Sequence, residues 1–500
     1  MKKVLCIVFA LLLTAAAAFA AGCAGTPAVT TDEVTAKTAE TTPPEQQTET
    51  TKPEETRAPD GLPEANYGGR VFRIITTEVS DKDVFTEDHL TNDTLHDAVY
   101  TRNLNVEERF GIDIEVTVDS YASVTNRVSR AVKSGSDEYD LCFVHMVNGA
   151  SLAQNNSVLP FEKLPYVDLS KPWWDKDIGN GFSIRNNLMM LNGDISPTSF
   201  SMTSCLYFNK NMFDKHDLAY PYELVREGKW TFDKLIEYTK DISQDMDGDG
   251  KISRDSDADV FGLTAYFLNV PYSFYYGAGG MLITKDADDV PFFEPQVERD
   301  TAIYAKIYEA IITNKSNFET EEAYEINTIK IFVDGRAMFY DANLGHSEQF
   351  MREMDNDYGI LPEPKFDEAQ ENYQSFVNGA ISMICVPTTV KEQNREYVSI
   401  IIEALASEAY NIVTPALKEN ILKRKMTRDA ESADMIDIIV RHRVFDMAYA
   451  NMFDGVGSYV RDLLRQKSEN GVSSKLKSYT KQTQKKINNI VKAFDESLIK

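Results

Sequence analysis

Apolar and polar residues follow two different spacings along the chain, and these spacings predict its strands and helices. Apolar residues at every second position, or in short unbroken runs, predict β-strands, whereas apolar residues three or four apart predict helices. Between residues 70 and 146 the two patterns alternate. The predicted strands here are 70–76, 112–118 and 140–146, and the predicted helices are 93–110 and 124–133. Such alternation is typical of a largely parallel sheet with helices on its faces.

The rest of the chain repeats this alternation and then becomes helical. Further strands are predicted at 204–209, 337–341, 358–362 and 380–386, and further helices at 230–242, 300–314 and 321–332. From residue 392 onwards nearly every stretch has helical spacing, including 430–453. Two rounds of strands and helices followed by a helical end predict an α/β protein with two or three domains.

The N-terminal segment 1–23 has the pattern of an export signal. Lys2 and Lys3 precede an apolar stretch at 4–18, and small residues then lead into Cys23. This segment is too short and wrongly flanked to be a stable membrane span. Its end resembles a bacterial lipobox, which implies that Cys23 is lipidated and becomes the mature N-terminus. The alternative is ordinary cleavage after an Ala-x-Ala-like site. Both alternatives put the mature protein outside the cell membrane.

The segment 24–65 is composed almost wholly of Thr, Ala, Glu, Pro and Gln. It has no hydrophobic periodicity, so it cannot bury enough apolar surface to offset the entropy of ordering. We expect a disordered tether that holds the folded part away from the membrane.

The net charge of the chain narrows its possible binding partners. The formal net charge is −26, and an acidic surface argues against nucleic acid and against an anionic membrane surface as partners. Membrane contact is therefore expected through the lipid anchor only, and the protein is expected to be a monomer.

After Cys23 only Cys142, Cys205 and Cys385 remain, each in an apolar run, which favours buried small hydrophobes over a disulfide framework.

Seven short stretches between residues 109 and 362 form an ordered set. The stretch 206–213 reads Leu-Tyr-Phe-Asn-Lys-Asn-Met-Phe, and 332–338 reads Phe-Val-Asp-Gly-Arg-Ala-Met. The others are 109–114, 133–141, 156–161, 229–233 and 358–362. In order and spacing they resemble the extracellular solute-binding proteins of ABC importers, in the carbohydrate-binding branch that is similar to maltose-binding protein.

The resemblance implies a two-lobed α/β structure, the periplasmic-binding-protein type II fold, with a hinge and a cleft between the lobes. Mapped on the motifs, lobe one takes 66–205 and 340–387, and lobe two takes 206–339 and the helical remainder 388–500. The implied function is capture of a sugar or oligosaccharide by lobe closure, for delivery to the membrane permease of an ABC importer. A protein of this kind works at the outer face of the cell membrane, lipid-anchored, and is not an enzyme.

Candidate ligand contacts in the first lobe follow from this arrangement. The motifs place His145, at the end of a predicted strand, on the rim of the cleft. Trp173 and Trp174 are adjacent in a loop, and an indole face stacks well on the C–H surface of a sugar. For the tryptophans the alternative is packing in the core, and for His145 it is a rim position without a ligand contact.

Aromatic and acidic residues elsewhere complete the predicted site. Tyr272 and Tyr275 precede a Gly-Gly turn and are candidates for the opposing wall of the cleft, or else for the core. Asp194 follows Asn-Gly, and Asp341 and Asn343 follow the second crossing between the lobes. These polar groups can accept hydrogen bonds from hydroxyls, or they can simply form turns.

An acidic loop near residue 250 has the spacing of an EF-hand calcium loop. Asp245, Asp247 and Asp249 occupy positions 1, 3 and 5, a glycine follows at 6, and Lys251 at 7 completes the predicted ligand set. Position 12 is Ser256, where a bidentate carboxylate is expected. The residues that can replace it are Asp255, Asp257 and Asp259. The alternative is a solvated acidic loop without calcium.

Two other functions remain open from the sequence. A secreted carbohydrate-active enzyme would also need aromatics and paired carboxylates, but no pair stands out among 78 acidic residues, and no Gly-x-Ser-x-Gly, His-Glu-x-x-His or P-loop motif occurs. A calcium-dependent carbohydrate adhesion or sensor module would need a second calcium repeat or a repeated domain, and the chain has neither.

The lipid anchor is directly testable. Replacing Cys23 by Ser removes the only thiol at the end of the signal, so we expect Cys23→Ser protein to be released into the medium while wild type stays with the membrane fraction. Immunoblotting of both fractions measures this. Retention of the variant on the membrane would contradict lipidation.

Overall fold

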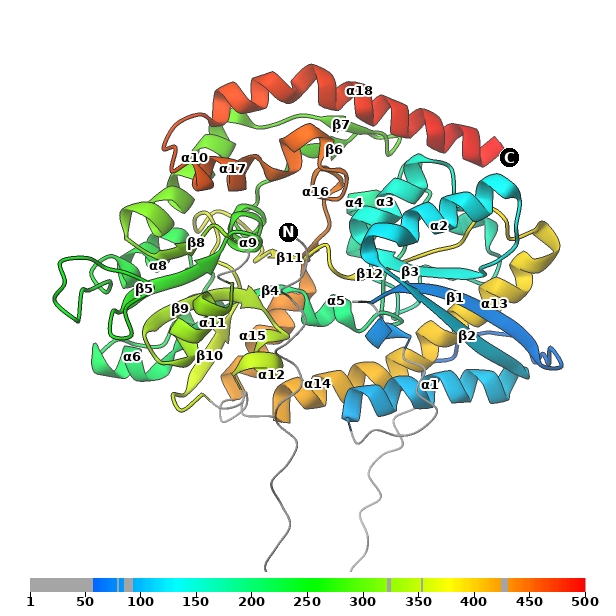
Figure 1. Cartoon of the computed structure of the whole chain (residues 1–500), viewed down its shortest axis with the longest axis horizontal. Helices are drawn as coiled ribbons and strands as arrows, with labels where there is room; N and C mark the ends of the chain where they lie inside the picture. Colours follow the sequence, from blue (N-terminus) through cyan, green and yellow to red (C-terminus); the bar gives the residue numbers. More distant parts are fainter. Residues whose placement is uncertain are drawn as a thin grey trace, which may run out of the picture. The chain divides into compact units, whose positions relative to one another are not determined.

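Two β-sheets organise the part of the chain described by the computed structural model (Figure 1). The described residues are 57–78, 81–84, 93–321, 325–351, 354–423 and 430–499. The predicted signal, Cys23 and most of the predicted tether lie outside these ranges.

The first sheet has the strand order β12-β3-β1-β2. Its strands are β1 (Arg70–Thr77), β2 (Ile112–Asp119), β3 (Leu141–His145) and β12 (Ser382–Cys385). Both β2 and β3 run parallel to β1, whereas β12 is antiparallel to β3. The first four residues of β3 are completely buried, as expected of a strand with cover on both faces. The predicted strands of this sheet are confirmed.

Helices cover the first sheet and begin and end where their capping residues require. These helices are α1 (Thr94–Phe110), α2 (Tyr121–Ser134), α3 (Met146–Gln154), α4 (Asp177–Phe182) and α5 (Thr198–Ser201), with short 3-10 turns η1 (Asp81–Asp83) and η2 (Phe161–Lys163). The Asp93 carboxylate accepts hydrogen bonds from the main-chain N–H groups of Leu95 and His96 and so starts α1. Gly111, with φ of 59°, ends it in the left-handed conformation.

The second sheet has the order β10-β4-β9-β5-β8 and is mixed rather than largely parallel. Its strands are β4 (Ser204–Asn209), β5 (Phe261–Tyr266), β8 (Asn317–Glu319), β9 (Ala337–Asn343) and β10 (Tyr358–Leu361). Strand β5 is parallel to β8 and β9, but β4 is antiparallel to both of its neighbours. Sequence spacing did not predict β5, because Gly262 interrupts its apolar run and the aromatic run after it continues into the next helix.

Helices and two small β-ribbons surround the second sheet. The helices are α6 (Lys210–Lys215), α7 (Tyr222–Arg226), α8 (Phe232–Thr239), α9 (Val270–Gly277), α10 (Val297–Tyr308), α11 (Glu325–Val333) and α12 (His346–Phe350), with a π-helix η3 (Glu309–Thr313). The ribbons pair β6 (Ile283–Lys285) with β7 (Pro291–Phe293), and β11 (Ser375–Phe376) with β13 (Arg443–Val444).

The C-terminal helices contact both lobes. They are α13 (Glu392–Glu408), the π-helix η5 (Ala409–Val413), α14 (Thr414–Lys423), α15 (Ala430–Arg441), α16 (Met447–Asn451), the 3-10 helix η6 (Phe453–Ser458), α17 (Tyr459–Arg465) and α18 (Val472–Ile499). The stretch 392–418 is long and apolar enough to cross a membrane, but 61% of its most apolar window is buried inside the fold. It is the core helix α13 and its continuation, which pack on α1.

These contacts correct the predicted lobe boundaries. Strand β10 belongs to the second sheet although 340–387 was assigned to lobe one, because it pairs with β4. Helices α13 and α14 pack on α1 in lobe one although 388–500 was assigned to lobe two. The second-lobe sheet therefore extends to residue 361, and the helical end is shared between the lobes.

Candidate functional site

A cavity of about 330 Å³ lies at the carboxyl ends of β5 and β9. These parallel neighbours end at Tyr266 and Asn343, and Asn269 caps the start of α9 three residues beyond β5. The carboxyl ends of strands are where open α/β sheets bind ligands. The pocket is lined by Met202, Tyr266, Leu268, Asn269, Ile326, Ile329, Tyr340, Asp341, Ala342, Asn343, His346, Gln349, Phe350, Asn378 and Ala380.

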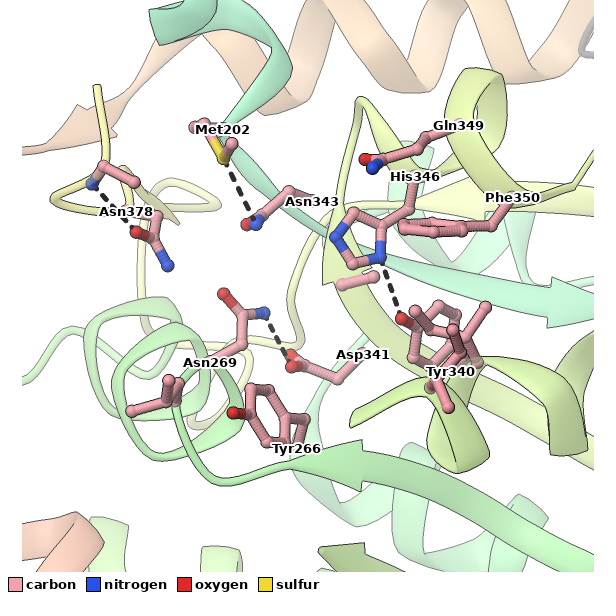
Figure 2. Close-up of a pocket in the computed structure, with 15 residues that line it drawn as sticks. Met202, Tyr266, Asn269, Tyr340, Asp341, Asn343, His346, Gln349, Phe350 and Asn378 are labelled. Carbon is pink, nitrogen blue, oxygen red and sulfur yellow. Dashed lines mark hydrogen bonds between the residues drawn. The ribbon is translucent and has the colours of Figure 1, made fainter. Parts of the chain in front are cut away.

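Three asparagine amides define the polar part of this pocket (Figure 2). Asn269 and Asn343 are each 6% exposed, and within the described ranges their carbonyl oxygens have no hydrogen-bond partner. Asn378 holds its own loop, because its Oδ1 accepts a hydrogen bond from the main-chain N–H of Ala380. A buried amide oxygen without a hydrogen-bond partner is costly to the free energy of folding. Such oxygens therefore mark a place where a polar ligand can bind.

Asp341 forms the floor of the pocket from the middle of β9. It is 1% exposed and accepts hydrogen bonds from Asn269 Nδ2 at 2.7 Å and from the Ser273 hydroxyl. Burial raises the pKa of Asp341 to about 7, although the Ser273 and Asn269 hydrogen bonds oppose this rise. A second buried carboxyl, Glu363, lies against it.

Aromatic rings and a neutral histidine form the remaining wall. The Tyr340 hydroxyl and His346 Nδ1 are 2.8 Å apart and hydrogen-bonded, and the Phe350 ring meets the His346 ring edge-on. Burial lowers the pKa of His346 to about 4, so the imidazole carries no charge at neutral pH. The wall is therefore uncharged and offers aromatic surface beside the amides.

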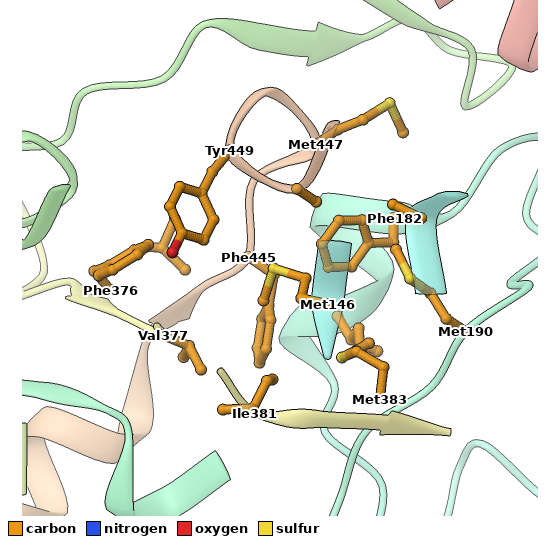
Figure 3. Close-up of a cluster of buried hydrophobic side chains, with 14 of the residues drawn as sticks. Met146, Phe182, Met190, Phe376, Val377, Ile381, Met383, Phe445, Met447 and Tyr449 are labelled. Carbon is orange, nitrogen blue, oxygen red and sulfur yellow. The ribbon is translucent and has the colours of Figure 1, made fainter. Parts of the chain in front are cut away.

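The pocket adjoins the segments that pass between the two sheets. Thr203 pairs with Val377, β11 pairs with β13, and the Asn378 N–H donates to the Met202 carbonyl at 3.0 Å. Beside them lies a cluster of buried apolar side chains from the first lobe, the crossing segments and the C-terminal region (Figure 3). The labelled members are Met146, Phe182, Met190, Phe376, Val377, Ile381, Met383, Phe445, Met447 and Tyr449. This cluster, here named the crossing cluster, supports the pocket residues Met202 and Asn378.

Among the predicted ligand residues, Asp341 lies at the pocket and the two tryptophans do not. Trp173 and Trp174 are 1% and 3% exposed in the core of lobe one. Both indole N–H groups donate at 3.0 Å to the two carboxylate oxygens of Glu403, on α13. The expectation that one of them faces the cleft is corrected, because their polar edges are satisfied inside the lobe.

The other predicted contacts also lie away from the pocket lining. Tyr272 stacks on Phe376 in the crossing region, and the Tyr275 hydroxyl donates to Asp300 at 2.6 Å. Asp194 accepts from the Thr414 hydroxyl at 2.6 Å, and burial raises the pKa of Asp194 to about 6. These three residues serve packing or structural hydrogen bonds in this structure.

His145 ends β3, as expected from the sequence, but it does not line the pocket. Its ring lies 4.8 Å from the Tyr121 ring, and its buried Nε2 has no partner within the part of the chain that the structure describes. Burial lowers the pKa of His145, despite the opposing charge of Glu78. It therefore sits at the carboxyl edge of the first sheet as a neutral side chain.

Sequence reasoning missed Asn269 and Asn378 as pocket residues. Asn269 follows β5, and because that strand was not recognised, nothing marked the residues after it as a strand end. Asn378 lies in a turn between β11 and β12 that joins the lobes. A signal was present in Asn378-Gly379, a turn-forming pair placed just before a strand.

The acidic loop gathers three carboxylates. Oxygens of Asp245, Asp247 and Asp259 all lie within 4.8 Å of one another. Asp259 holds the loop by accepting hydrogen bonds from the N–H groups of Met246 and Ser253, and Asp249 accepts from the N–H of Lys251. The structure thus brings Asp259, one of the three alternatives for position 12, to Asp245 and Asp247.

Comparison with known families identifies the chain. The family described as bacterial extracellular solute-binding protein matches residues 105–411, more than half of the sequence. The chain belongs to this family. The matched region includes every strand of the second sheet and three strands of the first. A search of curated protein sequences found no match.

Solved structures share the two-lobed fold of this solute-binding protein at low sequence identity. An ABC substrate-binding protein from Listeria monocytogenes, in complex with cycloalternan, is 11% identical with a TM-score of 0.53, covering 85% of this chain and 99% of its own. A cyclo/maltodextrin-binding protein complexed with maltotetraose is 13% identical, with a TM-score of 0.52 and coverages of 87% and 99%. An ABC transporter solute-binding protein from Agrobacterium radiobacter, in complex with ribitol, is 13% identical, with a TM-score of 0.50 and coverages of 84% and 99%.

The placement of the tryptophans yields a prediction. Changing both Trp173 and Trp174 to Phe removes two donors from the buried Glu403 carboxyl, so the free energy of unfolding should fall by about 1–3 kcal/mol per lost bond. Urea unfolding measures this. Trp230→Phe is the matched control, because the Trp230 indole donates to a neutral carbonyl, that of Pro362, and its loss should cost less. If the double variant keeps its stability but loses saccharide binding, the tryptophans contact the ligand instead.

Proposed function

We propose that this solute-binding protein captures an uncharged sugar, oligosaccharide or polyol in the pocket beyond β5 and β9. The observation that carries the proposal is the set of amides of Asn269, Asn343 and Asn378 in that pocket. A hydroxyl group both donates and accepts, and a planar amide offers one group of each kind. The rings of Tyr340 and Phe350 supply apolar surface for C–H groups.

The charge of the pocket favours an uncharged solute. Among the described residues, no lysine or arginine lines it, and its only acidic group, Asp341, is already hydrogen-bonded. An anionic ligand would have no cationic partner there, and it would lie close to a buried carboxyl pair. The structural neighbours support this chemistry, since they were solved in complex with cycloalternan, maltotetraose and ribitol.

Delivery to a membrane permease completes the proposed role. The predicted export signal and lipobox-like end support a location on the outer face of the membrane, with Cys23 as the lipid anchor. From there it would act as a monomer and pass the solute to an ABC importer. Because the pocket touches the crossing segments, a bound solute that also meets lobe one would favour the closed arrangement through contacts made only there.

A calcium ion is proposed for the acidic loop of lobe two. The carboxylates of Asp245, Asp247 and Asp259 are hard oxygen ligands of the kind that calcium prefers. The main-chain carbonyl of Lys251 and the carboxylate of Asp249 are the further predicted contributors. The ion would be structural, because it would cancel the repulsion among the acidic groups of a mostly exposed loop.

Replacing a pocket amide should separate binding from stability. Asn343→Leu removes a buried carbonyl oxygen that has no partner in the free protein, so the variant should melt at the same or a higher temperature. The same change should weaken saccharide binding by about 1–3 kcal/mol, the cost of leaving a buried hydroxyl of the solute without its hydrogen-bond partner. Thermal-shift and calorimetric titrations with maltose, maltotetraose and ribitol measure both effects.

Asn314→Leu is the control for this experiment, because Asn314 is also a buried amide of lobe two but donates to the Thr239 hydroxyl, outside the pocket. It should lower the melting temperature without changing affinity. If none of these solutes raises the melting temperature of the wild-type protein, the carbohydrate proposal fails.

Chelation tests the calcium proposal. We expect EDTA to lower the melting temperature of wild type and excess calcium to restore it, because a ligand bound only to the native state stabilises it. Asp245→Asn with Asp247→Asn should abolish this sensitivity, whereas Asp288→Asn, on an exposed turn elsewhere in lobe two, should keep it. A wild-type melting curve that is unchanged by EDTA would leave an acidic loop without metal.

A further inference from the structure

Two carboxyl groups are buried against each other beneath the pocket. Asp341 lies in β9, and Glu363 follows β10 by two residues, on the opposite side of β4 in the strand order. They are 1% and 0% exposed, and each side chain acts directly on the pKa of the other. The pair is therefore sealed from water next to the place where a solute would bind.

The hydrogen-bond donors around the pair are unevenly shared. Asp341 receives the Asn269 amide on one oxygen and the Ser273 hydroxyl on the other. In the described portion of the chain, neither oxygen of Glu363 receives a donor, and no cation pairs with it. Two carboxylates cannot both remain ionised in contact without a cation. One proton must lie between them, and the donor-free Glu363 is the group that carries it.

The other titratable groups around the pair stay neutral. Cys205 approaches from β4, and burial raises the pKa of its thiol well above the usual value. Helix α9 contributes Asn269, Ser273 and Gly277, none of which titrates. On the pocket side, the lowered pKa of His346 keeps its ring uncharged above pH 4 or so. Burial also raises the pKa of Glu363 itself, well above its usual value. Around neutral pH the titration of this region is thus that of the pair.

The protonated Glu363 has a consequence for the pocket. An Asp341 carboxylate that accepts a hydrogen bond from the protonated Glu363 carboxyl stays ionised and remains an acceptor towards α9, so the NH₂ group of Asn269 must face it. The carbonyl oxygen of Asn269 is then left on the side away from Asp341 (Figure 2). This oxygen is the one without a partner among the described residues.

We propose that Glu363 is a positioning residue, whose carboxyl proton keeps Asp341 an acceptor and thereby aims the Asn269 carbonyl at a hydroxyl donor of the bound solute. The proposal rests on the proposed function for the identity of the solute, but the proton and the amide orientation are properties of the free protein.

The proton can be observed without any solute. Burial raises the pKa of four other carboxyls, those of Asp194, Asp300, Asp446 and Glu403, only to about 6 to 7, so these groups are ionised at pH 8. Burial also raises the pKa values of the Asp83 and Glu319 carboxyls, but hydrogen bonds from Ser382 and Thr198 to Asp83, and the Arg254 charge beside Glu319, oppose the rise. Infrared spectra at pH 8 should therefore show one protonated carboxyl band that disappears in Glu363→Gln. Its absence from wild type, or its survival in Glu363→Gln, overturns the proposal. Glu227→Gln, at an exposed site, is the control and should keep the band.

The orientation of Asn269 can also be followed in the free protein. The side-chain amide signal of Asn269, assigned by its loss in Asn269→Leu, should shift as the pH passes through about 7, where Asp341 gains or loses a proton. In Asp341→Asn the signal should not respond to pH. If the wild-type amide signal does not change between pH 5.5 and 8.5, the Asn269 amide does not respond to the protonation of Asp341 and Glu363. That result overturns the positioning role.

Solute titrations then measure the consequence, with ribitol and maltotetraose as probes. Because binding favours ionised Asp341 as acceptor, affinity should rise with pH through about 7. Glu363→Gln keeps a donor towards Asp341 and should bind within about threefold of wild type, whereas Asp341→Asn should bind about tenfold more weakly and without pH dependence. A folded Glu363→Gln that binds tenfold more weakly contradicts the proposal. Failure of both probes on wild type counts against the proposed function instead, while the infrared and amide signals still decide the role of Glu363.

Discussion

The two lobes depend on a small region where three chain segments pass between the sheets. Main-chain groups in such a passage must be paired, because an unpaired buried N–H or C=O is costly. The segments solve this by pairing with each other: Thr203 bridges to Val377, and β11 runs beside β13. The crossing cluster packs beside them (Figure 3). The pocket owes its shape to this arrangement, since Met202 and Asn378 can line it only while those pairings hold.

Carboxylates and amides have separate tasks in this acidic protein. The buried carboxyls of Asp194, Asp300, Asp446 and Glu403 each accept hydrogen bonds from hydroxyl, indole or main-chain groups of the same fold. They tie distant elements together, as Glu403 ties α13 to the tryptophan loop. Within the part of the chain that the structure describes, the carbonyl oxygens of the neutral amides Asn269 and Asn343 are left without partners at the pocket. A buried amide without a partner costs less than a buried charge, so the protein can keep it ready for a solute at a tolerable loss of stability.

Sequence patterns located most strands and the two-lobed plan, but only two of the predicted ligand residues, Asp341 and Asn343, line the pocket. Strands such as β4 (Ser204–Asn209) are recognisable because local spacing determines them, whatever the partner strand. A side chain's neighbours are determined by contacts between distant segments. The adjacent tryptophans at 173 and 174 suggested a sugar-binding surface, yet their partner, Glu403, lies about 230 residues away and draws both indoles inward. Glu363 gave no sequence signal, because its role exists only where β9 and the end of β10 come together.

The placement of β12 affects how the molecule is assembled. This strand pairs with β3, and all five strands of the second sheet lie between them in the sequence. A chain made from its N-terminus onwards presents β1, β2 and β3 early, but one edge of β3 stays unpaired until residue 385 has been made. The second sheet has all of its strands by residue 361. Closing a loop of this length also carries an entropic cost that local pairing avoids. The sheet that begins first along the chain is thus the sheet that is finished last, and its open edge is the surface that must be protected during synthesis and export.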